Sequence, residues 1–179
     1  MSPEQRGHER DHGPIVVLIG SPGAGKTSVG RRVAERLGVP FADSDALIEA
    51  RAGMSVSDIF VTDGEDRFRQ LEEDTIAEAL EEQDGVLSLG GGAVMRPQTR
   101  ERLAGSQVVW LRVSLSDAAS RVGMNTARPL LLGNVRGTLA ALLEQRNPVY
   151  EEVSTAVVET SGHSLREVTD EVMKVVQGG

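Results

Sequence analysis

The chain contains no cysteine, so disulfide bonds and thiolate metal sites are both excluded. The absence of disulfides fits a reducing compartment, although it fits others too, and we expect a cytoplasmic protein by default. No apolar stretch approaches the roughly eighteen residues that a membrane-spanning helix needs, so we expect no membrane partner. Lysine is also nearly missing: Lys26 and Lys174 are the only two in 179 residues.

Positive charge is in deficit overall, since the formal net charge is −8 at pH 7. Nucleic-acid-binding domains usually carry a basic face, so this balance argues against a nucleic-acid partner. The hydrophobic share of 39% and the charged share of 26% are typical of a globular domain. We expect a disordered polar tail over residues 1–13, a single domain over 14–177, and a monomer.

Short apolar runs alternate with helical patterns along the chain. Strands are expected over residues 15–19, 39–43, 86–89, 108–113 and 156–159. Helices are expected over 26–37, from the second strand to 53, from 55 through 60, and over 65–83, 116–122, 138–146 and 165–176. Residues 124–137 combine a proline, two glycines and a leucine run, which predicts a mobile loop. The alternation predicts a parallel α/β sheet covered on both faces, with ligands at the carboxyl ends of the strands.

Residues 20–27 read Gly-Ser-Pro-Gly-Ala-Gly-Lys-Thr and match the pattern G-x-x-x-x-G-K-[ST]. Glycines let the backbone wrap around phosphates, and the helix that follows places its positive end at the same point. Lys26 can then reach the terminal phosphates, and the Thr27 hydroxyl is available to magnesium. The alternative is an accidental glycine-rich turn. Because the match lies between an expected strand and an expected helix, nucleotide binding is favoured.

Two further clusters lie at the expected carboxyl edge of the sheet. Asp43 and Asp45 follow the second strand, and carboxylates two residues apart can divide magnesium binding from proton acceptance. Either could instead only cap the next helix. Residues 90–92 are three glycines that permit close backbone approach to a ligand, or form a simple turn. The chain has no Asn-Lys-x-Asp sequence, which argues against a GTPase.

Taken together, the motifs resemble those of shikimate kinases, in the same order along the chain. They are the loop at 20–27, Asp43-x-Asp45, Phe68-Arg69-x-x-Glu72, Gly90-Gly91-Gly92, Asn125-Thr-Ala-Arg128-Pro129-Leu130 and Arg146-x-Pro-x-Tyr150. The resemblance implies a three-layer α/β/α, nucleoside-monophosphate-kinase-like P-loop fold, with a five-stranded parallel sheet of order 2-3-1-4-5. It also implies transfer of the ATP γ-phosphoryl group to the 3-hydroxyl of shikimate, with Mg²⁺, in chorismate and aromatic amino-acid synthesis.

The resemblance also implies roles for individual residues, with a substrate-binding region at about 43–72 and a lid at about 124–137. The catalytic residues would be Asp45 as base, Lys26 and the lid residue Arg128. ATP would be bound by Gly23, Ala24, Gly25, Lys26, Thr27, Ser28, Arg121, Arg128 and His163. Shikimate would be bound by Asp45, Phe60, Arg69, Gly90, Gly91, Gly92 and Arg146, the two arginines binding its carboxylate. The metal residues would be Thr27, directly, and Asp43, through water.

Alternatives remain for these assignments. Arg69 lies in a glutamate-rich helix and could simply pair with Glu65, Glu72 or Glu73. Arg146 could likewise pair with a neighbouring glutamate or cover a helix end. Gluconate kinases and nucleoside-monophosphate kinases share the fold and the phosphate loop, so another small acceptor is possible. A third hypothesis is that the protein is a relative of these kinases that binds ATP but does not catalyse phosphoryl transfer.

Overall fold

In the residues that the computed structural model describes, 13–124 and 132–178, five parallel strands form one sheet. The strands are β1 (Val16–Ile19), β2 (Phe41–Asp43), β3 (Val86–Ser88), β4 (Val108–Arg112) and β5 (Ala156–Glu159). Their order is β2-β3-β1-β4-β5, and every printed pairing is parallel. The predicted topology is therefore confirmed.

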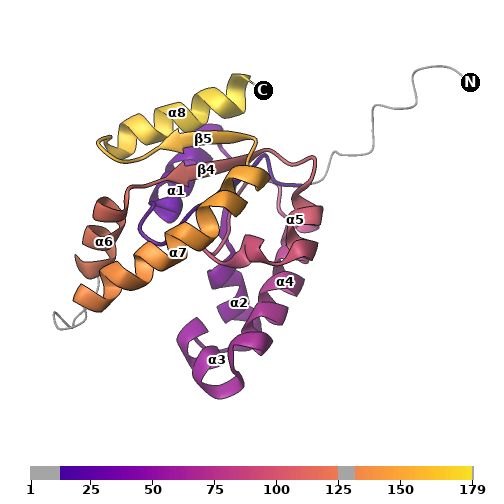
Figure 1. Ribbon diagram of the computed structural model, residues 1–179. Coiled ribbons are helices and arrows are strands. Elements are labelled where there is room, and N and C mark those ends of the chain that lie inside the picture. The colour runs from indigo at the N-terminus through magenta and orange to yellow at the C-terminus, as the bar shows by residue number, and fades with distance from the viewer. Residues whose placement is uncertain (1–12, 125–131, 179) are drawn as a thin grey trace, which may run out of the picture.

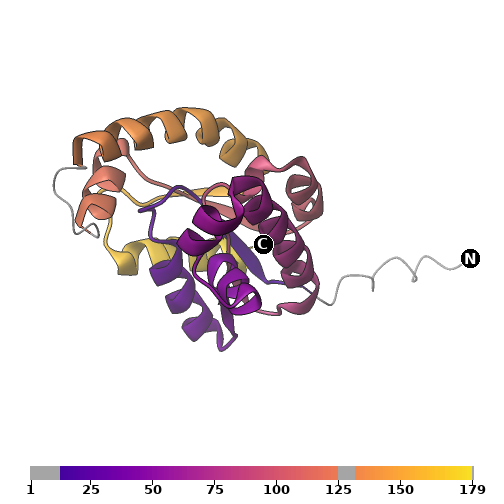
Figure 2. The ribbon, with the colours of Figure 1, turned by 90° about the horizontal axis from the view of Figure 1, so that it is seen from below.

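The helices are α1 (Lys26–Leu37), α2 (Ser44–Ala52), α3 (Val56–Asp63), α4 (Glu65–Glu82), α5 (Pro97–Leu103), α6 (Leu115–Met124), α7 (Leu132–Val153) and α8 (Leu165–Gly178), with a short 3₁₀ turn η2 (Ala93–Met95). Helices α1 and α8 cover one face of the sheet, while α4, α5 and the end of α7 cover the other. Helices α2, α3 and α4 gather at the end of the molecule away from α8 (Figure 1). In Figure 2, seen from below, this group lies in front of the sheet. None of the helices in the described ranges is long and apolar enough to cross a membrane.

Strand β1 lies at the centre of the sheet and is buried on both faces. Val16 and Leu18 join the core under α1 and α8, whereas Val17 and Ile19 join the core under α4 and α5. An uninterrupted run of β-branched and leucine side chains is what such a doubly covered parallel strand requires. The loop that follows β1 is thereby anchored on the most buried strand of the domain.

Helix α7 differs from the prediction at both ends. Residues 132–137 were expected to be loop, but the helix already begins at Leu132, and it continues through Pro148 to Val153 instead of ending at Arg146. A proline inside a helix removes one backbone hydrogen bond. The last turn nevertheless forms because it carries Tyr150, which is fully buried against Trp110. Met124, the first residue of the expected lid, is the last residue of α6, and residues 125–131 lie outside the described residues.

Candidate active site

The loop between β1 and α1 has the backbone geometry of a phosphate cradle. Gly23 and Gly25 have φ angles of 84° and 88°, in the left-handed region that glycine adopts without strain. A Cβ on Gly20 would lie 2.7 Å from the carbonyl oxygen of Leu111, so no other residue fits there. Gly25 is the N-cap of α1 and gives it no side-chain cap, which leaves the helix N-terminus open to an anion.

The Lys26 side chain folds back over this loop. Its ammonium donates to the carbonyl oxygens of Gly20 at 2.7 Å and Ser21 at 3.1 Å. Burial lowers the pKa of Lys26 to about 8, although the negative charges of Asp43 and Asp45 act to raise it. The loop therefore holds a partly desolvated cation whose charge a bound phosphate would stabilise.

Thr27 and Asp43 meet beside the loop, and Asp43 has two sets of partners. The Thr27 hydroxyl donates to Oδ2 of Asp43 at 3.3 Å. The other oxygen, Oδ1, accepts from the backbone N–H groups of Asp45 at 2.8 Å and Ala46 at 3.3 Å, which caps α2. The capping alternative is thus confirmed for Asp43 without excluding a metal role. A hydroxyl beside a carboxylate is an oxygen donor set that suits Mg²⁺.

Such a set is small, and within the described ranges no group of three or more His, Asp or Glu side chains could hold a metal ion. Mg²⁺ in nucleotide sites is typically held by one or two protein oxygens together with the phosphates and water. Thr27 and Asp43 fit that arrangement.

Asp45 faces the glycine turn at residues 90–92. A Cβ on Gly90 would lie 3.0 Å from Oδ1 of Asp45 and 3.2 Å from Oε2 of Glu72. Burial, followed by the charge of Asp43, raises the pKa of Asp45, and Lys26 opposes the shift. A carboxylate made more basic in this way is suited to accept a proton from a hydroxyl group.

Two arginines from distant helices converge on the same turn. A Cβ on Gly91 would lie 3.0 Å from Nη1 of Arg146, in α7, and one on Gly92 would lie 2.6 Å from Nη2 of Arg69, in α4. The Cβ on Gly91 would also lie 3.2 Å from Cδ of Pro22, in the phosphate loop. The backbone of residues 90–92 therefore lies directly against a carboxylate, two guanidinium groups and the phosphate loop, where a side chain at any of the three positions would displace these groups.

The pairing alternative for Arg69 is also borne out. Its Nη1 lies 2.8 Å from Oε1 of Glu72, a side chain only 2% exposed, and its Nε lies 3.8 Å from Glu65. Burial raises the pKa of Glu72, and the hydrogen bond and charge of Arg69 oppose the shift. From the sequence, Glu72 was expected only as one of three alternative partners of Arg69, without a role in ligand binding. Its i,i+3 spacing from Arg69 on one helix was the available signal.

Arg146 differs from Arg69, because no ion pair to Glu144 or Glu151 is found in the part of the chain that the structure describes. Phe60, the expected ring contact, lies in α3 with its ring centroid 4.6 Å from that of Phe68. Phe68 in turn lies under the Arg69 guanidinium at 5.2 Å. The expected aromatic residue thus belongs to the same cluster as the arginine.

A small pocket of about 230 Å³ adjoins the phosphate loop on the other side. Its lining includes Gly25, Ser28, Arg121 and His163. Arg121 Nη1 donates to the carbonyl oxygen of Gly23 at 2.7 Å, which fastens α6 to the loop. Residues expected near the nucleotide base are therefore adjacent to the phosphate loop. Arg128 lies outside the described residues.

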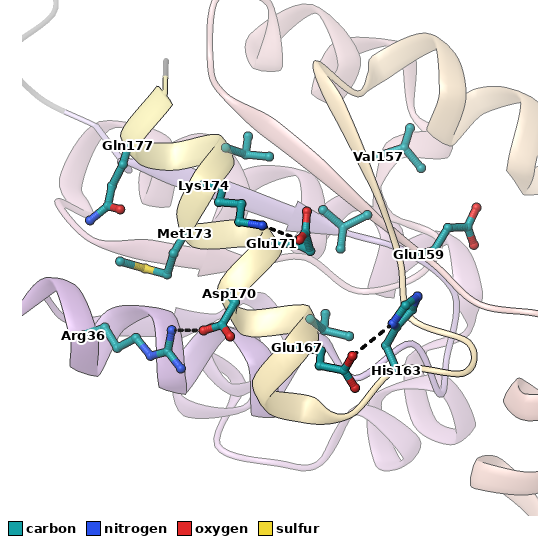
Figure 3. A pocket seen from close by; sticks show the side chains of 13 residues that line it. Arg36, Val157, Glu159, His163, Glu167, Asp170, Glu171, Met173, Lys174 and Gln177 are labelled. Atoms are coloured by element: carbon teal, nitrogen blue, oxygen red, sulfur yellow. Dashed lines mark hydrogen bonds and ion pairs between the residues drawn. The ribbon is translucent and has the colours of Figure 1, made fainter.

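A larger surface groove of about 850 Å³ lies elsewhere, between β5, α8 and the end of α1 (Figure 3). Its charged side chains bind one another: Arg36 pairs with Asp170, and Lys174 pairs with Glu171 (Figure 3). The phosphate loop itself contributes no lining residue to this groove. Size alone therefore does not mark the active site.

Comparison with known proteins agrees with the site geometry. The family model described as shikimate kinase matches residues 22–177. A shikimate kinase of Thermobifida fusca is 58% identical over 161 residues, which cover 90% of this chain and 94% of the relative. One from Salinispora arenicola is 50% identical, covering 89% of this chain and 95% of the relative.

Solved structures give the same result. A shikimate kinase from Acinetobacter baumannii in complex with shikimate superposes with a TM-score of 0.85 at 34% identity, covering 94% of each chain. A gluconokinase from Sinorhizobium meliloti superposes less well, with a TM-score of 0.63 at 25% identity over 91% of each chain. The chain belongs to the shikimate kinase family.

Proposed function

We propose that this protein transfers the γ-phosphoryl group of ATP to the 3-hydroxyl of shikimate, giving shikimate 3-phosphate and ADP. The step would serve chorismate and aromatic amino-acid synthesis. One observation carries the proposal: Asp45, Arg69 and Arg146 converge on a glycine turn that packs against the phosphate loop. An acceptor that bears both a carboxylate and a hydroxyl group suits this arrangement.

The acceptor half of the site would work as follows. Arg69 and Arg146 bind the carboxylate, because a guanidinium offers two parallel N–H donors to one carboxylate. The backbone of Gly91 adds a contact, and Phe60 packs against the ring. Asp45 then accepts the proton of the attacking hydroxyl. Its raised pKa supports this role.

In the nucleotide half, the open N-terminus of α1 and Lys26 bind the phosphates, where negative charge builds up during transfer. Arg121 and His163 lie near the base, in the pocket beside Ser28. Mg²⁺ would be held by Thr27 directly and by Asp43 through water, and when bound it neutralises phosphate charge. Arg128, which the sequence places in a lid and which lies outside the described residues, would add a cation on closing.

The non-catalytic alternative fits less well, because Lys26, Thr27, Asp43 and Asp45 lie together around one loop, in contact with one another or with the loop itself. We also propose a monomeric enzyme, since one chain supplies every group named above, and a cytoplasmic location, since a chain without cysteine fits a reducing compartment. Size-exclusion chromatography with light scattering tests the oligomeric state directly.

The decisive experiment compares ADP release with shikimate, gluconate and nucleoside monophosphates, each with ATP and Mg²⁺. We expect shikimate to be the best acceptor by at least about 100-fold in kcat/KM, because the matched family and the solved relative in complex with shikimate both favour this acceptor. Lys26→Ala provides the background rate of a folded chain. Faster turnover of gluconate would assign the protein to the other acceptor class.

A further inference from the structure

The backbone groups of the glycine turn can be accounted for one by one. The N–H of Gly90 donates to Oγ of Ser44 at 2.9 Å. The carbonyl oxygen of Gly90 accepts a hydrogen bond from the N–H of Ala93 at 3.1 Å, and that of Gly92 accepts one from the N–H of Met95 at 3.1 Å. The carbonyl oxygen of Gly91 accepts from the hydroxyl of Tyr150. Within the described ranges, only the N–H groups of Gly91 and Gly92 are left without a partner in this turn.

Tyr150 is well placed to control this turn. Its side chain is 0% exposed, and its ring packs against Trp110 with a centroid distance of 5.8 Å. It also lies one helical turn after Arg146 in α7, so both side chains extend from the same stretch of helix towards the turn. Burial raises the pKa of Tyr150, and the charge and side-chain hydrogen bond of Arg146 oppose this shift. The hydroxyl therefore lies between Arg146 and the turn, and a fixed ring that carries it can hold the two in register.

The bond to Gly91 also sets the direction of the next N–H group. The described residues contain no cis peptide, so the carbonyl of Gly91 and the N–H of Gly92 point in opposite directions across one planar unit. Glycines on both sides of that unit allow it to rotate at little steric cost. The Tyr150 hydroxyl favours the one orientation that turns the Gly92 N–H away from the core. Arg69 lies against Gly92 as well.

We propose that Tyr150 is a positioning residue that orients the Gly91–Gly92 peptide, so that the Gly92 N–H donates to the carboxylate of the acceptor between Arg69 and Arg146. Tyr150 itself touches no substrate. The inference rests on the proposed function, because it assigns this donor to the carboxylate of shikimate. Orientation in advance of binding matters since a misaligned donor must first reorganise.

The test is Tyr150→Phe, which keeps the ring and removes the hydroxyl. We expect Kd and KM for shikimate to rise about tenfold, the usual effect of losing one hydrogen bond to a charged group, while KM for ATP stays unchanged. With the neutral methyl ester of shikimate, wild type and variant should differ by less than about twofold. Thr169→Val is the control: it removes a fully buried hydroxyl that also binds a backbone carbonyl, that of Leu165 at 2.7 Å, within α8.

Amide NMR adds a readout that does not depend on activity. Shikimate should move the Gly92 amide resonance of the wild type, and move it less in Tyr150→Phe. If shikimate binds and is phosphorylated but Tyr150→Phe weakens acid and ester equally, or weakens neither, the positioning role is overturned and the proposed function stands. The same holds if the acid alone is weakened but shikimate still moves the Gly92 amide resonance as in the wild type, because the effect then arises from the contact of Tyr150 with Arg146. If the wild type neither binds nor phosphorylates shikimate, the proposed function fails and this inference fails with it.

Discussion

The hydroxyl of Thr27 donates to Oδ2 of Asp43, while Oδ1 of the same carboxylate caps helix α2. One side chain thus links the start of the phosphate-binding helix to the start of the helix that carries Asp45. The capping role of Asp43 is confirmed and its magnesium role stays a prediction, because its two oxygens have different partners. The two contributions can be separated by mutation.

Asp43→Asn should keep the cap, since asparagine is an equally good N-cap residue, but should weaken the magnesium link. We expect the Mg²⁺ concentration for half-maximal activity to rise about tenfold, with the free energy of unfolding changed by less than about 0.5 kcal/mol. Asp43→Ala should show the same magnesium defect and also lose about 1 kcal/mol of stability. Magnesium titrations and urea unfolding measure the two effects. An Asn variant with normal magnesium dependence would contradict the metal role.

Lys26 should couple nucleotide binding to proton uptake. Its pKa of about 8 in the free protein means that a large fraction is neutral at pH 8, and the phosphates of ATP should raise that pKa. ATP binding at pH 8 should therefore take up part of a proton, which calorimetry in buffers of different ionisation enthalpy measures. Lys26→Ala should lose this uptake and lower kcat by about 1,000-fold or more, while remaining folded. Equal uptake in both proteins would assign the proton to another group.

The parts of the fold that follow from local sequence were predicted well. The strand at 156–159 has the expected bounds, and the helix at 26–37 begins at Lys26 and ends before Gly38, whose left-handed φ of 66° closes it. These elements carry their own signals: β-branched runs, the phosphate-loop motif and a C-terminal glycine. The strand order followed from the resemblance to a known family rather than from local patterns.

Elements that depend on distant contacts were not predictable in the same way. The sequence around Pro148 favours a helix end, but the burial of Tyr150 under Trp110 extends α7 past it. Helix α5 was missed although Pro97 at its first turn is a common start signal. Within the site, the sequence named Glu72 among three possible partners of Arg69, but the burial of Glu72 depends on the packing of α4 against the core.

Asp45→Asn should abolish most turnover and yet stabilise the free protein. The pKa of Asp45 is raised in the folded state, so its ionised form is less favourable there than in the unfolded chain. The stabilising contribution of a raised pKa is present below the unfolded value and is lost as the pH rises through the folded value. At pH 7 the asparagine variant should therefore melt a few degrees higher, and this advantage should disappear near pH 4.

Kinetics of the same variant give the functional half of this prediction. Turnover should fall by about 100-fold or more, because the proton acceptor is lost. Excess Mg²⁺ should not restore activity, in contrast to Asp43→Asn. Magnesium rescue of Asp45→Asn alone would reverse the roles assigned to the two aspartates.

Arg69→Lys and Arg146→Lys should have the same kinetic effect but different effects on stability. Each loses the paired N–H donors that bind a carboxylate, so KM for shikimate should rise about 10- to 100-fold, and KM for ATP much less. Both variants should also discriminate less between shikimate and its neutral methyl ester.

Stability distinguishes the two variants because only Arg69 binds a buried glutamate. Glu72 is 2% exposed and accepts from Arg69 at 2.8 Å, and a shorter, differently shaped lysine leaves it poorly paired. Arg69→Lys should therefore cost about 1–3 kcal/mol of unfolding free energy, whereas Arg146→Lys should cost under about 1 kcal/mol. Urea unfolding without ligand measures this directly. Equal losses of stability would mean that Glu72 does not depend on Arg69, and unchanged ester discrimination in both variants would move carboxylate recognition to other residues.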